Sequence, residues 1–204
     1  MPVSSDMMEG GVAVVTISPE ASANTFSTKN FVPLISTLDE LLSDQSCSSV
    51  VLTGTGRFFS VGGNIDDFSM GIEEGNIGQM VQQMTDRLHP LLLRLRSSET
   101  VLVCAMNGSV AGGGLGLALA ADYRICVPEA KLAPAFFSLG LSPDGGTTWL
   151  LPRLVGNQAA KRFFFENEPW SAEQALENGA VDEVVDADKL VERAIQVARD
   201  WGSW

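Results

Sequence analysis

The sequence predicts an α/β protein, and three observations support that prediction. Short apolar runs rich in β-branched residues alternate with longer segments whose apolar residues recur every three or four positions. Two strand-to-helix junctions, at residues 53–68 and 107–125, contain clusters of glycine. With 204 residues, 45% of them hydrophobic, the chain is long enough to bury one core of ordinary size. We therefore expect a single domain over residues 1–204.

The first half of the chain contains three predicted strands and two predicted helices. Apolar runs bounded by glycine or polar residues predict strands at 11–17, 49–56 and 100–106. Amphipathic spacing predicts helices at 31–42 and 78–95. Ser27 or Thr28 is available to cap the first helix, whereas Pro90 should kink the second or mark a helix start.

The second half continues the alternation of strand and helix. A glycine cluster leads into an alanine- and leucine-rich helix that ends near Asp122, and a strand is expected at 123–127. A loop over 128–147 then precedes a helical stretch at 147–156. The segment 171–201 reads as two amphipathic helices around a short strand at 179–185.

Composition limits the partners and the compartment. A net charge of −12 repels phosphate backbones and anionic membranes, so neither nucleic acid nor a membrane surface is an expected partner. No apolar run approaches the roughly 18 residues of a membrane span. Cys47, Cys104 and Cys126 are interpreted as reduced core residues, and a single histidine, His89, leaves no basis for a metal site. The N-terminal segment does not read as a leader peptide, so we expect a cytoplasmic protein.

The two glycine junctions carry the most chemical information. Small residues at the end of a buried strand let a ligand approach the backbone, and a helix start offers unpaired N–H groups that stabilise an anion. The alternative is a simple packing turn. A dinucleotide-binding GxGxxG pattern fails, because its sixth position, counted from Gly112, is Leu117. Ser109 lacks the GxSxG pattern of a serine hydrolase, since Asn107 takes the place of the first glycine.

Four segments, taken together, resemble the crotonase superfamily of enoyl-CoA hydratases and isomerases. They are GVAVVTI at 11–17, FFSVGGNIDDF at 58–68, NGSVAGGGLGLALAADYRI at 107–125 and PDGGTTWLLPRLVG at 143–156. The resemblance implies a spiral of ββα units that binds an acyl-CoA thioester, with coenzyme A as part of the substrate and no further cofactor. It also implies a trimer or a dimer of trimers, and a C-terminal helical part that is short or truncated here.

The resemblance assigns roles to particular residues. Two backbone N–H groups, of Gly63 and Gly113, would hold the thioester oxygen while an enolate forms. The acyl group would lie against Phe68, Phe136, Leu139 and Leu141, and the coenzyme against Ser60, Val61 and Asn64. The segment 18–28, where family members are rich in Arg or Lys, has no cation before Lys29, which weakens the expected grip on the phosphates.

The reaction depends on which acid–base groups are present. Positions that hold glutamates in hydratases are Gly116 and Phe136 here, and neither side chain transfers a proton. Asp144 stands where some isomerases of the family carry an aspartate, and one carboxylate suffices to move a proton from C2 to C4. Its apolar neighbours should raise its pKa. An isomerase is therefore the leading hypothesis, with a hydratase or a non-catalytic acyl-CoA-binding protein as alternatives.

Other readings of Asp144 and its neighbours stay open. Pro-Asp-Gly is a common turn, and related enzymes use a carboxylate here as a nucleophile, as in aryl-CoA dehalogenation. His89 is interpreted as a surface or groove residue. Asp66 and Asp67 are interpreted as a solvated helix start, and Asp122 as a structural residue. The four tryptophans, Trp149, Trp170, Trp201 and Trp204, are assigned to packing or to exposed ends.

Overall fold

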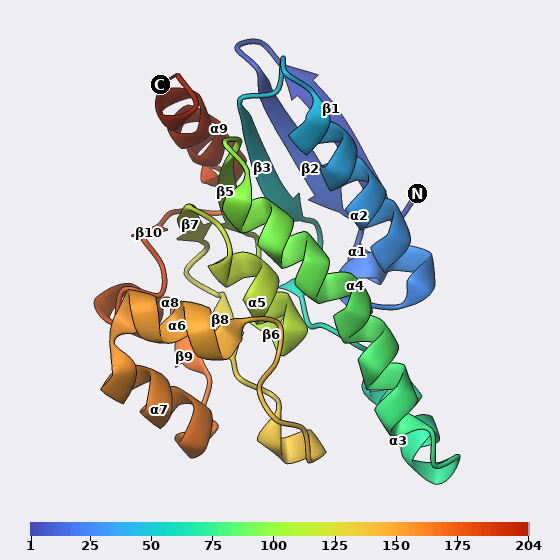
Figure 1. Ribbon diagram of the computed structural model, residues 1–204. Coiled ribbons are helices and arrows are strands. Elements are labelled where there is room, and N and C mark those ends of the chain that lie inside the picture. Colours follow the sequence, from blue (N-terminus) through green and yellow to red (C-terminus); the bar gives the residue numbers. More distant parts are fainter. Residues whose placement is uncertain (204) are drawn as a thin grey trace.

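A computed structural model describes residues 1–203, and within them the larger of two sheets has six strands (Figure 1). Their spatial order is β1 (Val3–Met8), β2 (Val12–Ile17), β3 (Ser49–Gly54), β5 (Val101–Met106), β7 (Tyr123–Cys126) and β10 (Glu183–Val184). Strand β1 is antiparallel to β2, and the other neighbouring pairs are parallel. Every residue of β3 is buried, as expected of a central strand covered on both faces.

The smaller sheet has four strands in the described part of the chain. They are β4 (Phe58–Ser60), β6 (Ser109–Ala111), β8 (Lys131–Ala133) and β9 (Trp170–Ser171). Strands β3, β5 and β7 of the larger sheet are each followed along the chain by a strand of the smaller sheet, so β3–β4, β5–β6 and β7–β8 form successive turns of a spiral. Helical segments follow these pairs. The predicted spiral of ββα units is thereby confirmed.

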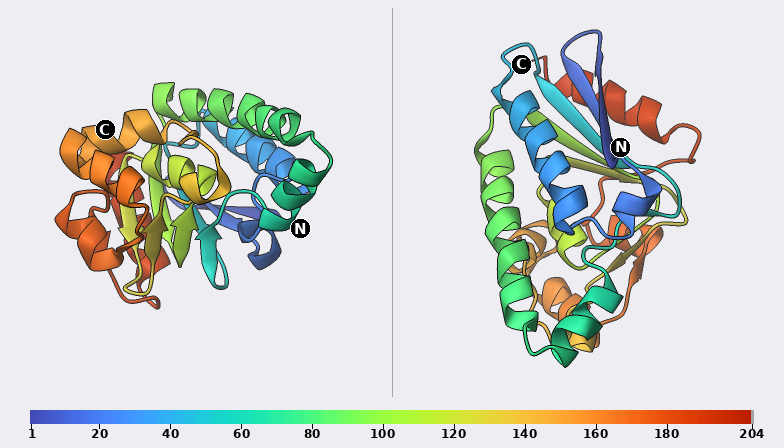
Figure 2. Two further views of the ribbon diagram at one scale, coloured as in Figure 1. Left: turned by 90° about the horizontal axis from the view of Figure 1, so that it is seen from below. Right: turned by 90° about the vertical axis from the view of Figure 1, so that its right-hand side faces the viewer.

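Helices cover both faces of the larger sheet. Figure 2 shows α2 and α4 side by side on one face and α9 on the opposite face. The Arg94–Asp39 ion pair, with 3.1 Å between nitrogen and oxygen, joins α4 to α2. The helices are α1 (Pro19–Ser22), α2 (Thr28–Ser43), α3 (Ile65–Glu73), α4 (Ile77–Ser97), α5 (Gly113–Leu119), α6 (Thr147–Val155), α7 (Asn157–Glu166), α8 (Ala172–Glu177) and α9 (Leu190–Trp201).

Two predictions about local structure are corrected. The segment 128–147, expected to be a loop, contains strand β8 and a 3₁₀ turn at Phe137–Leu139. Helix α4 continues through Pro90, so this proline does not mark a helix start. The apolar side of α4 buries four leucines, and their burial offsets the backbone hydrogen bond that Pro90 removes. Strand β1 escaped prediction because Val3 alone among its six residues is buried.

Several single-residue predictions are confirmed. All three cysteines are free and buried. The Asp122 carboxylate accepts a hydrogen bond from the Leu102 amide at 2.9 Å and pairs with Arg96 at 2.8 Å, so it is structural. Trp170 packs on Phe163, whereas Trp149 and Trp201 are about half exposed; Trp204 lies outside the described residues. Among the described helices, none combines the length and apolarity that crossing a bilayer requires.

An ion pair between a buried arginine and a partly exposed aspartate ties β7 to the C-terminal part of the chain. The Arg124 guanidinium lies 2.7 Å from the Asp182 carboxylate, and its side chain is 5% exposed. We expect Asp182→Ala to lower the free energy of unfolding by about 3 kcal/mol, because it leaves a buried cation without its counter-ion. Glu166→Ala, which removes an exposed partner of Arg162, should cost at most about 0.5 kcal/mol. Urea denaturation of both variants measures this contrast, and equal losses would contradict it.

Candidate active site

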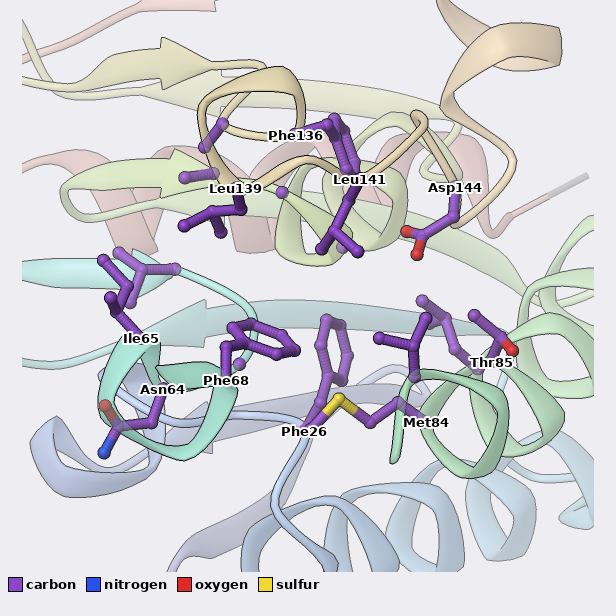
Figure 3. A pocket seen from close by; sticks show the side chains of 18 of the residues that line it. Phe26, Asn64, Ile65, Phe68, Met84, Thr85, Phe136, Leu139, Leu141 and Asp144 are labelled. Atoms are coloured by element: carbon purple, nitrogen blue, oxygen red, sulfur yellow. The ribbon is translucent and has the colours of Figure 1, made fainter. Parts of the chain in front are cut away.

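A cavity of about 490 Å³ lies where the two glycine turns, helices α3 and α4 and the segment after β8 meet (Figure 3). Most of its walls are apolar, and Asp144 is the acidic side chain that faces its inner part in the close view. The lining residues include Phe26, Phe58, Val61, Gly63, Asn64, Phe68, Met84, Leu88, Gly113, Ala135, Phe136, Leu139, Leu141 and Asp144. The spiral thus collects residues from five separate parts of the chain around one space.

The first glycine turn is held by backbone hydrogen bonds to the segment after β2. The Val61 amide donates to the Ser22 carbonyl at 3.0 Å, and the Phe26 amide donates to the Gly62 carbonyl at 3.3 Å. Gly62 has φ +82°, a conformation that favours glycine. Within residues 1–203 the Gly63 N–H has no hydrogen-bond acceptor, although Gly63 lines the cavity. This N–H is therefore available to a ligand.

The second glycine turn begins helix α5 beside the first. Gly112 has φ +54°, and its amide donates to the Ala133 carbonyl at 3.4 Å. Gly113 is the first residue of α5, and its N–H has no acceptor within the described chain, as is usual for a first-turn amide. A methyl group placed on Gly62 would lie 3.4 Å from the Gly113 nitrogen, so the two turns adjoin. Two unpaired N–H donors thus belong to neighbouring turns of one cavity.

Glycines let α5 fit between two backbones. A Cβ on Gly114 would overlap Ser60, and one on Gly116 would overlap the carbonyl of Gly145, with the carbonyl carbon at only 2.9 Å. The first contact packs α5 on the turn that carries Gly63. The second contact packs α5 on the loop that carries Asp144. Helix α5 therefore sets the distance between the turn that carries Gly63 and the loop that carries Asp144.

A phenylalanine ring covers each of the two glycines. A Cβ on Gly63 would lie 2.7 Å from the Phe68 ring, and one on Gly113 would overlap the Phe26 ring. Figure 3 shows both rings reaching into the cavity, on the side opposite Leu141. A group that accepts hydrogen bonds from these two N–H groups would therefore lie between apolar walls. Hydrogen bonds to a developing charge are stronger there than in water.

Asp144 combines a turn with a half-buried carboxyl. Its carbonyl accepts hydrogen bonds from the Thr147 amide at 3.1 Å and the Thr147 hydroxyl at 2.7 Å. Its carboxyl lines the cavity and has no hydrogen-bond partner among residues 1–203. Burial raises the pKa of this carboxyl above its usual value, and the charge of nearby His89 partly opposes the rise. The predicted turn and a chemical role are therefore compatible.

Nine of the ten predicted site residues line this one cavity. They are Val61, Gly63, Asn64, Phe68, Gly113, Phe136, Leu139, Leu141 and Asp144. Ser60, predicted to contact the coenzyme, is fully buried outside the lining, and its hydroxyl lies 2.7 Å from the Thr25 hydroxyl. That prediction is corrected, because the side chain of Ser60 packs the first glycine turn against α5. Asn64 lines the cavity and also caps α3 through the Asp66 amide.

Sequence reasoning missed several lining residues. Met84 and Leu88 are one helical turn apart on α4, and this spacing could have placed both on one face. Phe26 gave no signal, because the chain folding that brings it to the cavity is not local. Phe58 begins the segment FFSVGGNIDDF, but that pattern did not assign the phenylalanine a place in the cavity. Arg57 lies over the ring of Phe58, with 5.0 Å between the guanidinium carbon and the ring centre, and so places a cation beside the cavity. It lies outside the segment 18–28, where family members are rich in Arg or Lys. Among the described residues, no group of three or more His, Cys, Asp or Glu side chains could hold a metal ion.

His89 and the two aspartates at the start of α3 lie as expected. His89 is exposed on α4, close enough for its charge to act on Asp144. Asp66 and Asp67 occupy the first turn of α3, where negative charge is favourable. Asp67 additionally accepts a hydrogen bond from the Asn24 side chain at 3.2 Å. This bond connects the start of α3 to the segment that supports the first glycine turn.

Comparisons with known proteins give one consistent result. Over 94% of its length the chain is 35% identical to the 1,2-epoxyphenylacetyl-CoA isomerase of Escherichia coli, of which it covers 73%. It is 31% identical over 93% of its length to a 4-chlorobenzoyl coenzyme A dehalogenase of an Arthrobacter species, of which it covers 68%. A structure of a putative enoyl-CoA hydratase/isomerase from Mycobacterium abscessus superposes with a TM-score of 0.90 at 28% identity, covering 98% of this chain and 76% of that one.

The family model described as enoyl-CoA hydratase/isomerase matches residues 7–203. This range includes both glycine turns, helix α5 and the loop that carries Asp144. The chain has the crotonase fold and is a member of the enoyl-CoA hydratase/isomerase family.

Proposed function

We propose that this protein is an acyl-CoA isomerase that shifts a double bond from the 3,4 to the 2,3 position of an enoyl thioester. The observation that carries the proposal is the arrangement of one cavity. It holds two backbone N–H groups without an acceptor among residues 1–203 and one half-buried carboxyl, and its walls are mostly apolar. The N–H groups are those of Gly63 and Gly113, and the carboxyl is that of Asp144.

The two N–H groups would act as an oxyanion hole. Removing a proton from C2 of a thioester moves negative charge onto the thioester oxygen. Donors already fixed in position stabilise that charge without reorganising, which is why each is worth about 10²- to 10³-fold in rate in other enzymes. The backbone hydrogen bonds at Val61 and Gly62, together with the packing of Gly114, hold these donors in position.

Asp144 would move the proton. As carboxylate it takes the C2 proton, and the electron pair of that C–H bond forms the dienolate held by Gly63 and Gly113. As carboxylic acid it then returns the proton to C4, so that the double bond moves and Asp144 is regenerated. Burial raises the pKa of this carboxyl above its usual value, which favours the acid form that the second step needs. Because the carboxyl has no hydrogen-bond partner among residues 1–203, it is free to serve both carbons.

Water addition is less well supported. A hydratase would need a glutamate at position 116, but a Cβ there overlaps the Gly145 carbonyl, so a longer side chain would displace the Asp144 loop. At the second glutamate position, Phe136 is 2% exposed and forms part of the apolar wall. Neither position that holds a glutamate in hydratases therefore supplies a second carboxylate to orient and deprotonate water. Asp66 also lines the cavity, but it is exposed in the first turn of α3.

A second candidate reaction is substitution on an aryl-CoA. It is favoured by His89, whose charge acts on Asp144, and by the likeness to 4-chlorobenzoyl coenzyme A dehalogenases. In this reaction the Asp144 carboxylate attacks the ring carbon, halide leaves, and water assisted by His89 hydrolyses the resulting ester. The two candidates use the same carboxylate, once as a base and once as a nucleophile.

We also propose that the protein is a homo-oligomer. The support is a set of large apolar side chains exposed on the helical surface, with Phe165 76%, Leu93 72% and Trp149 52% exposed. Large apolar side chains that are exposed in one subunit are commonly covered where subunits associate. A trimer or a dimer of trimers is the arrangement we propose.

The first test replaces the proposed base. Asp144→Asn keeps size and turn geometry but cannot accept a proton, so conversion of 3-enoyl-CoA to 2-enoyl-CoA should fall by about 10²- to 10⁴-fold. Affinity for acyl-CoA should barely change. The measurement is absorbance of the conjugated thioester, with solvent deuterium exchange at C2 and C4 followed by mass spectrometry.

Three outcomes separate the hypotheses. Isomerisation retained in Asp144→Asn would leave Asp144 a turn residue only. Chloride release from 4-chlorobenzoyl-CoA by the wild type, without exchange into an enoyl-CoA, would favour substitution. Binding of acyl-CoA with neither reaction would make this a non-catalytic acyl-CoA-binding protein.

The second test removes one N–H donor. Gly63→Pro deletes the donor, so turnover should fall by about 10²- to 10³-fold, with a smaller effect on substrate binding because the enolate forms only on the way to the transition state. Gly63→Ala keeps the N–H and only pushes against the end of the Phe68 ring, so it should lose much less activity. A folded Gly63→Pro protein with full turnover would show that Gly63 is not a donor.

The third test uses stability. Burial raises the pKa of Asp144 in the folded protein above its value in the unfolded chain. The free energy of unfolding is therefore highest when this carboxyl is neutral, below the unfolded pKa of about 3.9, and it falls as pH rises through the folded pKa. Asp144→Asn should therefore unfold at higher urea concentration than the wild type at pH 7, with a difference that narrows toward about pH 4. Asp6→Asn, at an exposed position of β1, controls for the lost charge. A difference that does not vary with pH would contradict the burial of this carboxyl.

A further inference from the structure

We propose that the Phe68 side chain is the end wall of the acyl pocket and sets the length of acyl chain that the protein accepts. The inference rests on the proposed function, since it assumes that an acyl thioester occupies the cavity. It concerns a specificity-determining residue: Phe68 takes no part in proton transfer and does not contact the coenzyme in this scheme.

A second cavity lies directly behind that wall. It has a volume of about 170 Å³ and is lined by apolar side chains from α3, from the start of α4 and from the segment after β8, with two serines. It shares Ile65, Phe68, Leu139 and Leu141 with the main cavity. Because the same four side chains line both spaces, they form the partition between them.

Phe68 is the member of this partition whose removal would join the two cavities. Ile65 is 62% exposed, so much of it faces solvent, whereas the Phe68 ring reaches inward and packs over the Cα of Gly63. A Cβ on Gly63 would lie 2.7 Å from that ring and 3.6 Å from the Met84 methyl, so the ring fills the space beside the first donor. In Figure 3 the ring lies between Asp144 at one end of the view and Ile65 and Leu139 at the other.

The position of the ring determines where an acyl chain must stop. A thioester carbonyl held by Gly63 and Gly113 starts the chain beside the ring, and the chain then follows the apolar side chains toward Leu139 and Leu141. With the ring in place the chain ends in the cavity of about 490 Å³; without it the chain continues into the second cavity. Most of the side chains that line the second cavity are apolar, so methylene groups that enter it lose part of their contact with water.

The experiment compares acyl length in binding rather than in turnover. Isothermal titration calorimetry with butanoyl-, octanoyl- and dodecanoyl-CoA is applied to the wild type and to Phe68→Ala. For the wild type we expect affinity to stop rising with length before dodecanoyl-CoA. For Phe68→Ala we expect dodecanoyl-CoA to bind about tenfold more tightly than to the wild type, since each newly buried methylene contributes about fourfold.

A second substitution tests whether the gain comes from the second cavity. Ile77, the first residue of α4, is half-buried. It lines the second cavity but not the main one. Adding Ile77→Trp to Phe68→Ala should fill the space and return the dodecanoyl-CoA affinity to the wild-type value. Phe68→Leu removes the ring but leaves a larger side chain than alanine, so it should give a smaller gain in the same direction. It serves if Phe68→Ala does not fold, as judged by thermal unfolding.

The outcomes distinguish this inference from the function on which it rests. Binding of CoA thioesters with the same dependence on length in the wild type and both Phe68 variants would overturn the role of Phe68 and leave the proposed function standing. A gain that persists after Ile77→Trp would equally overturn it. Failure of the wild type to bind any of the three thioesters would overturn the proposed function and this inference together.

Discussion

The close contact between helix α5 and the two loops on either side of it is the constraint on which the site depends. Gly114 touches the turn that carries Gly63, and Gly116 touches the carbonyl of Gly145 beside Asp144. A side chain at either glycine would push one loop away. Because backbone meets backbone there, the Gly63 and Gly113 amides and the Asp144 carboxyl are fixed around one cavity without long, flexible side chains between them.

That same contact has a chemical consequence. The space that a glutamate would need at position 116 is already filled by the Gly145 carbonyl, so the arrangement that positions Asp144 also removes a second acid–base group. Asp144 is left half-buried, without a hydrogen-bond partner in the described chain. A carboxyl in such surroundings has a raised pKa and costs stability when ionised, a cost that proteins commonly accept at functional sites.

The apolar walls complete this environment. Rings of Phe26 and Phe68 cover the Cα atoms of Gly113 and Gly63, so water has little access to the side of each donor. Low local polarity strengthens hydrogen bonds to a developing charge and also raises the pKa of the neighbouring acid. In the proposed function, electrostatic stabilisation and proton transfer would therefore depend on the same packing, and the ring of Phe68 would also bound the space left for an acyl chain.

Sequence by itself determined the α/β class, most strands and helices and both glycine turns, because buried strands, amphipathic helices and glycine clusters are local patterns. It also singled out Asp144 as a carboxylate in a turn among apolar residues. It did not reveal β1 or β8, whose few buried residues leave no pattern, or the continuation of α4 through Pro90. Only the tertiary structure showed that Ser60 packs inside the turn, and that Phe26, Phe58 and Met84 line the cavity. Those positions follow from contacts between segments far apart in the chain, which local spacing does not encode.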